Sequence, residues 1–116
     1  MTDHDSPTKL VMMIVSDRDA DDLMATLVER SFTATKVGSS GGFLRRGNVT
    51  IFAGVTADQV ETVVDIVHEI CPQRMELVPV QTLPFIADNA FATEPVQVRA
   101  GGAVVFVRNV ERFERV

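Results

Sequence analysis

Apolar and polar positions along the first third of the chain follow two different periods. Residues 10–15 form an unbroken apolar run, LVMMIV, and a run this short fits a strand buried on both faces better than a helix. Ser16 then precedes a segment with helical spacing. Its apolar positions are Ala20, Leu23, Met24, Leu27 and Val28. Residues 32–37 alternate as a half-buried strand does, so the pattern predicts strand, helix and strand.

A second unit of the same kind follows. Asn48–Val55 has the pattern of a strand, and Thr56 followed by Gln59 forms the capping-box signature of a helix. The apolar positions expected on the buried side of this helix are Val60, Val63, Val64, Val67, Ile70 and Cys71. Pro72 ends the helix because proline cannot continue the hydrogen-bond ladder, and residues 75–80 then have the composition of a strand.

The remainder of the chain is less regular. Residues 83–95, with proline near both ends, break every period and predict a long exposed loop of the kind that often carries function. Val96–Ala100 alternates, Gly101-Gly102 predicts a turn or bulge, and residues 103–107 form one more apolar strand. At the other end of the chain, residues 1–8 are polar and predict a flexible tail ahead of a single domain over residues 9–116.

These elements predict an α+β fold in which two strand-helix-strand units lie side by side. The expected architecture is a ferredoxin-like βαββαβ sandwich with an extra C-terminal strand and with both helices on one face of a mostly antiparallel sheet. The other face of the sheet is then bare. Because apolar strand residues on that face need cover, we expect a homo-oligomer in which the sheets of neighbouring subunits meet.

Composition narrows the class of protein. The hydrophobic fraction of 46% against 23% charged residues excludes a disordered chain, and no apolar run approaches the ~20 residues of a membrane span, so no membrane insertion is expected. A net charge of −5 argues against nucleic acid as a partner. Cys71 is the sole cysteine and the N-terminus lacks a signal-peptide pattern, which together predict a cytoplasmic protein.

A glycine-rich loop over residues 38–47 is the first candidate site. Backbone N–H groups at its glycines, beside the guanidinium groups of Arg45 and Arg46, are the components of a phosphate or other anion site. A solvated loop tip is the alternative. The loop matches neither the nucleotide P-loop nor GxGxxG, so the two interpretations stay open at this point.

Apolar residues in the same loop favour a pocket. Phe43 and Leu44 either tuck back into the core or wall a site in which an aromatic ring stacks on a base. The Asn48 amide matches the donor and acceptor of an adenine edge, although an asparagine at a strand start also bonds the local backbone.

The sequence gives little support for metal binding or for catalysis. The carboxylates of Asp17, Asp19, Asp21 and Asp22 lie at a helix start, where the helix dipole favours them, and they lack the EF-hand spacing of a calcium site. His68 has the position of a partly exposed helix residue, and no serine-histidine or cysteine-histidine constellation is present. We therefore expect no catalytic residue, no metal and no cofactor.

Residues 32–55 contain the motif FxATKxxxxGGFLRxGNxTxxxGV, which resembles the signature of the PII-like cyclic di-AMP receptors of bacteria. Asp17 and Asp19 after the opening run, and the closing stretch VRAGGAVVFV at residues 98–107, resemble the same family, so the similarity covers about residues 9–113. It implies a PII-like subunit and a homotrimer with ligand clefts between subunits, without catalysis. The implied ligand is cyclic di-AMP, whose binding would order loops and so pass a signal to a protein partner.

The resemblance also implies the ligand contacts. Asn48 and the Gly54 backbone would read adenine, Phe43 and Leu44 would wall the base, and loop amides would face the phosphates. The implied contacts are Thr35, Gly42, Phe43, Leu44, Asn48, Gly54 and Phe106.

This chain departs from the family at positions near those contacts. Thr33 stands where the family usually has a phosphate-binding arginine, Ser31 where it has asparagine, and Arg115 where it has glutamine. Arg46, at a position more often small in the family, is our candidate to compensate for the missing arginine, beside Arg45 and Thr33 in the same predicted site.

Two alternatives to a cyclic di-AMP receptor follow. One is a PII-like sensor of another adenine nucleotide, such as ATP, ADP or AMP. The other is an acylphosphatase-like hydrolase, which shares the ferredoxin-like fold but cradles phosphate in a loop after the first strand. Here Asp17 and Asp19 occupy that place and would repel phosphate.

Overall fold

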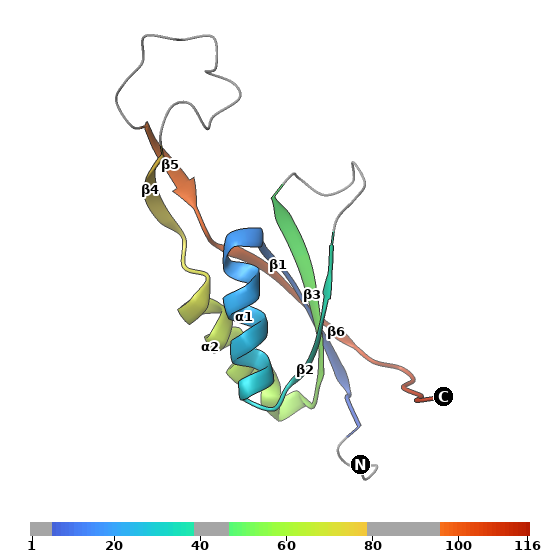
Figure 1. The fold of residues 1–116 in the computed structure, drawn as a ribbon. Helices are drawn as coiled ribbons and strands as arrows, with labels where there is room; N and C mark the ends of the chain where they lie inside the picture. The colour runs from blue at the N-terminus through green and yellow to red at the C-terminus, as the bar shows by residue number, and fades with distance from the viewer. Residues whose placement is uncertain (1–5, 39–46, 79–95) are drawn as a thin grey trace.

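A computed structural model describes residues 6–38, 47–78 and 96–116 of the chain (Figure 1). The strands and helices formed by these residues alternate along the sequence. They are β1 (Lys9–Ser16), α1 (Asp17–Glu29), β2 (Thr33–Val37), β3 (Asn48–Val55), the short 3-10 helix η2 (Ala57–Gln59), α2 (Val60–Ile70), β4 (Arg74–Val78), β5 (Val96–Ala100) and β6 (Ala103–Asn109).

The main sheet has the strand order β2-β3-β1-β6, and every neighbouring pair in it is antiparallel. Both helices cover one face of this sheet (Figure 1). Strands β4 and β5 form a separate two-stranded antiparallel sheet, here called the ribbon, which extends past the first turn of α1 (Figure 1). The predicted α+β, ferredoxin-like arrangement with additional C-terminal strands is confirmed.

The edge strand beside β1 is nevertheless β6 and not β4, the strand that directly follows α2. Strand β6 pairs with β1 from Lys9↔Asn109 to Val15↔Ala103. It is apolar on both faces, so Val105 can pack against the core under the helices. Strand β4 carries Arg74 and Glu76 on one side, and such a strand cannot fill this place without burying charge.

The core lies between the sheet and the two helices. Ser16 begins α1 by accepting a hydrogen bond from the Arg18 N–H at 3.2 Å. The predicted capping box is confirmed, since the Thr56 N–H donates to Gln59 Oε1 at 3.0 Å. The buried apolar residues are Val11, Met13, Val15, Ala20, Leu23, Leu27, Val49, Ile51, Ala53, Val55, Val63, Ile66, Val67 and Cys71.

Within residues 6–38, 47–78 and 96–116, no helix covers the face of the sheet away from α1 and α2 (Figure 1). The residues on this face are those that alternate with the core residues along each strand, such as Met12 opposite Phe106 and Ile14 opposite Val104. Phe106 is 50% exposed and Val104 is 51% exposed. An apolar face of this kind is the one for which the sequence predicts a partner subunit. Neither α-helix in the described part of the chain is long and apolar enough to cross a bilayer.

Candidate functional site

An open cavity of about 920 Å³ lies where β1 begins and β3 ends, beside the C-terminal segment. It includes three of the residues predicted to bind ligand, namely Thr33, Thr35 and Gly54. The complete lining is Pro7, Leu10, Ser31, Phe32, Thr33, Thr35, Phe52, Gly54, Thr56, Asp58, Gln59, Val110, Phe113 and Arg115. The cavity is therefore built from segments at both ends of the sequence as well as from the edge strand.

Strand pairing brings the predicted residues together. Thr33 lies opposite Gly54, and Thr35 lies opposite Phe52, in the antiparallel pair of β2 and β3. Alternation along β2 places Thr33 and Thr35 on the uncovered side of the sheet, while Ala34 between them packs against the core. A Cβ added at Gly54 would lie 3.1 Å from Pro7 Cβ, so glycine leaves this part of the cavity open.

The end of α1 supplies another hydroxyl. Ser31 adopts a left-handed φ of 68°, and its N–H donates to Val28 O at 3.0 Å. This is the usual way to close a helix, although glycine or asparagine is more common there than serine. The turn places Ser31 in the lining of the cavity beside Phe32.

The lining combines groups that suit a nucleotide. Aromatic rings come from Phe32, Phe52 and Phe113, and Arg115 is the sole cation among the described lining residues. Asp58 is the sole carboxylate among them, and it accepts a hydrogen bond from the Thr56 hydroxyl. Apolar rings with a few converging polar groups are typical of small-ligand sites. This cavity can accept a planar ring and an anionic group together.

The other predicted ligand residues lie elsewhere. Asn48 pairs with Ser16 at the opposite end of β3, about 20 Å from Gly54 by the rise of a strand. Phe106 lies opposite Met12 on the uncovered sheet face, outside the cavity lining. The predicted contacts in the glycine-rich loop are outside the described residues. They are Gly42, Phe43, Leu44, Arg45 and Arg46.

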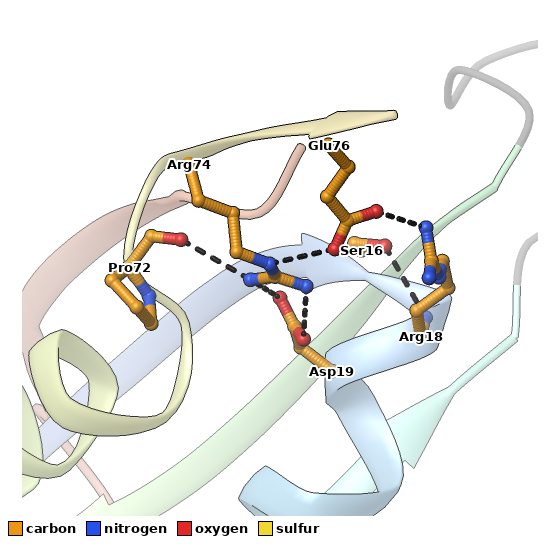
Figure 2. A network of polar contacts seen from close by, with 6 residues as sticks. All are labelled: Ser16, Arg18, Asp19, Pro72, Arg74 and Glu76. Atoms are coloured by element: carbon orange, nitrogen blue, oxygen red, sulfur yellow. Dashed lines mark hydrogen bonds and ion pairs between the residues drawn. The ribbon is translucent and has the colours of Figure 1, made fainter. Parts of the chain in front are cut away.

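A network of ion pairs near the Asn48 end of the sheet joins α1 to the ribbon (Figure 2). Arg74 on β4 donates through Nη2 and Nη1 to the carboxylate of Asp19 at 3.1 and 3.3 Å, and through Nε to Glu76 at 2.8 Å. Arg18 in turn pairs with Glu76. Asp19 is only 7% exposed, so the charge of Arg74 compensates a nearly buried carboxylate.

Sequence reasoning missed this network. It attributed Asp19 to the helix start and gave Arg74 no role, and no local pattern links residues so far apart in the chain. Within the described ranges, no group of acidic, histidine or cysteine side chains is placed to hold a metal ion.

The network keeps its members charged. Hydrogen bonds to Asp19 and Glu76 raise the pKa of Arg74, and the hydrogen bond from Arg74, followed by that from Arg18, lowers the pKa of Glu76. The same turn of α1 also holds Gly47, because the Asp17 N–H donates to Gly47 O at 2.7 Å. The first turn of α1 is therefore a common attachment for the ribbon and for the start of β3.

For Cys71, which is buried and on which the charges of Asp19 and Arg74 act, we predict a pH-dependent contribution to stability. Burial raises the pKa of the thiol from 9.0 to about 11, and the charge of Asp19 acts in the same direction. The unfolded chain therefore releases the thiol proton at lower pH than the folded chain. The contribution of the neutral thiol is complete below pH 9.0 and is lost as pH rises to about 11.

Urea unfolding of the wild type and of Cys71→Ala across pH 8 to 11 measures this effect. The free energy of unfolding of the wild type should fall more steeply above pH 9.0 than that of the variant. Parallel curves over the whole range would contradict the raised pKa.

The hydrolase alternative finds no support at the start of α1. Strand β1 ends at Ser16 and α1 begins at Asp17, so no loop intervenes to cradle a phosphate. The nearby arginine, Arg18, is paired with Glu76.

Comparison with known proteins gives two further findings. A family model described as "Cyclic-di-AMP receptor" matches residues 8–116. The chain is also similar to a functionally unknown protein from Pediococcus pentosaceus ATCC 25745, with 34% sequence identity and a TM-score of 0.72. That match covers 96% of this chain and 99% of the other chain, whose structure was determined by crystallography.

Proposed function

Because the chain belongs to the cyclic-di-AMP receptor family, we propose that it is a non-enzymatic signal transduction receptor. It binds cyclic di-AMP in clefts between the subunits of a homotrimer and passes the signal to a protein partner. The proposed location is the cytoplasm, in agreement with a single buried, unpaired cysteine, Cys71.

The observation that carries this proposal is the chemistry of the cavity. It places Thr33, Thr35 and Gly54 beside phenylalanine rings and one guanidinium group. Rings of this kind stack on a base, and hydroxyl and guanidinium groups donate to a phosphodiester. The volume of about 920 Å³ lies within the range of sites for small molecules.

The separation of the predicted contacts supports a site shared between subunits. Asn48 lies about 20 Å from Gly54 along β3, so a compact ligand in the cavity does not reach Asn48 of the same chain. A neighbouring subunit packed on the uncovered sheet face would bring its own Asn48 and glycine-rich loop to the cavity. The exposed Val104 and Phe106 supply apolar surface for such packing.

In the proposed relay, ligand binding is communicated through residues 44–46 and 83–95, which lie outside the described residues. The first turn of α1 supports this route, because its contacts reach both Gly47 and the ribbon. The partner protein itself is undefined.

Thermal shift and titration calorimetry test the ligand. We expect cyclic di-AMP to raise the melting temperature, since a ligand of the folded state stabilises it by about 2.7 kcal/mol at a concentration of 100 times Kd. Cyclic di-GMP, with the same backbone and charge, is the matched control and should give little shift. No heat and no shift with cyclic di-AMP would overturn the proposal.

A sensor of another adenine nucleotide is the second candidate. The cavity observed in one chain has room for a single base with one phosphate and does not need Asn48 of a neighbour. Including AMP, ADP and ATP in the thermal-shift series distinguishes the two candidates. A larger shift with one of these nucleotides than with cyclic di-AMP would favour the second.

A further inference from the structure

We propose that Arg115 binds a phosphate of the nucleotide in the cavity beside β2 and contributes to its affinity. This inference rests on the proposed function and assigns the phosphate contact to a residue that the predicted set of ligand contacts did not include. It starts from the charges that line the cavity.

Arg115 is the one cation among the described lining residues, and Asp58 is the one anion. The Asp58 carboxylate already accepts the hydroxyl hydrogen of Thr56, within the turn that begins α2. Arg115 has no ion pair with any carboxylate in the described part of the chain. Its planar guanidinium group therefore keeps its donors for a ligand, and a phosphodiester accepts such donors in pairs.

The C-terminal segment places this arginine at the cavity. The Val110 N–H donates to Thr8 O at 3.0 Å, which attaches the segment to the chain just ahead of β1. Val110, Phe113 and Arg115 then all line the cavity. Phe113, Arg115 and Thr33 thus line the same cavity, a combination of a ring, a guanidinium group and a hydroxyl that suits a base with its phosphate.

Several other cations in the described part of the chain already have a carboxylate partner and do not line the cavity. Arg74 pairs with Asp19 and Glu76, Arg18 with Glu76, and Lys36 with Asp21 at 3.2 Å. A neighbour of Arg115 in the sequence, Arg112, pairs with Glu114 at 2.7 Å and does not line the cavity. Arg112 therefore provides a matched control, because it has the same charge in the same segment.

Titration calorimetry with cyclic di-AMP on the full chain tests the assignment. Arg115→Gln should weaken binding by about tenfold or more, as expected for loss of a hydrogen bond to a charged group. Arg112→Gln, with the same change in net charge, should change the affinity by no more than about twofold. Both side chains are exposed, so the fold should tolerate either substitution.

A second experiment tests whether an arginine elsewhere in the cavity restores the affinity that Arg115→Gln loses. Because Thr33 lines the same cavity, Thr33→Arg in the Arg115→Gln background should restore most of the lost affinity, whereas Arg112→Gln in that background should not. If the wild type binds cyclic di-AMP and the two variants, Arg115→Gln and Arg112→Gln, bind it with equal affinity, the role of Arg115 is overturned and the receptor function is not. No binding by the wild type would overturn both.

Discussion

Gly101→Ala is expected to destabilise the fold by about 3 kcal/mol, through backbone strain together with a steric clash. Gly101 has a φ of +73°, a conformation that costs a residue with a Cβ about 1–2 kcal/mol. A Cβ at this position would also lie 2.2 Å from Pro72 O and 2.5 Å from Arg74 Nη1. The backbone carbonyl cannot rotate away as a flexible side chain can, so the chain itself has to move.

The neighbouring glycine is a matched control. Gly102 has a φ of +81°, but a Cβ there would meet Gln73 Cγ at 3.5 Å, an ordinary contact. Gly102→Ala should therefore cost only the backbone strain, about 1–2 kcal/mol. Urea unfolding of both variants measures the difference. Equal losses of stability would show that the close approach to Pro72 has no energetic consequence.

The location of Gly101 explains why this substitution should also affect the ribbon. The chain leaves β5 at Ala100 and enters β6 at Ala103, so Gly101 lies where the chain passes from the ribbon to the main sheet. The carbonyl of Pro72 accepts a hydrogen bond from Arg74 Nη1 at 3.2 Å, and a displaced carbonyl would disturb that contact. Faster amide hydrogen exchange in β4 of Gly101→Ala, compared with Gly102→Ala, is the expected accompanying result.

Val104→Glu is expected to convert the proposed trimer into a monomer. Val104 lies opposite Ile14 on the sheet face away from α1 and α2, and it is 51% exposed in the single chain. In a trimer packed through this face, the substitution would bury a carboxylate in each subunit without a partner. The cost of an unpaired buried charge is several kcal/mol, more than one apolar contact supplies.

Light scattering coupled to size-exclusion chromatography measures the mass of each species. Val28→Glu is the control, because Val28 is 60% exposed on α1, in the layer on the opposite side of the sheet. It should leave the mass unchanged. A Val104→Glu protein that remains trimeric would contradict packing through the sheet face, and a monomeric wild type would contradict the trimer itself.

Local rules accounted for most of the secondary structure. Ser16 and the Thr56–Gln59 box begin helices as predicted, because capping depends on residues within one turn of each other. Residues 32–37 alternate as a half-buried strand does, and the structure agrees, since Ala34 packs against the core while Thr33 and Thr35 lie on the open side. The motif around these strands identified the family, and two of the contacts that it implies, Thr35 and Gly54, lie in one cavity.

Those local rules could not predict contacts between segments that are distant in the sequence. The pairing of β6 with β1, in place of β4, follows from which strand can bury both faces, a competition that no single window of sequence contains. Asp19 and Arg74 meet only because the ribbon lies beside α1. Phe113 and Arg115 join Thr33 only because the C-terminal segment returns to the start of β1. Helix caps and strand alternation depend on residues that are close in the sequence, so the sequence alone predicts them. The cavity and its charge depend on segments that are distant in the sequence and that only the folded chain brings together.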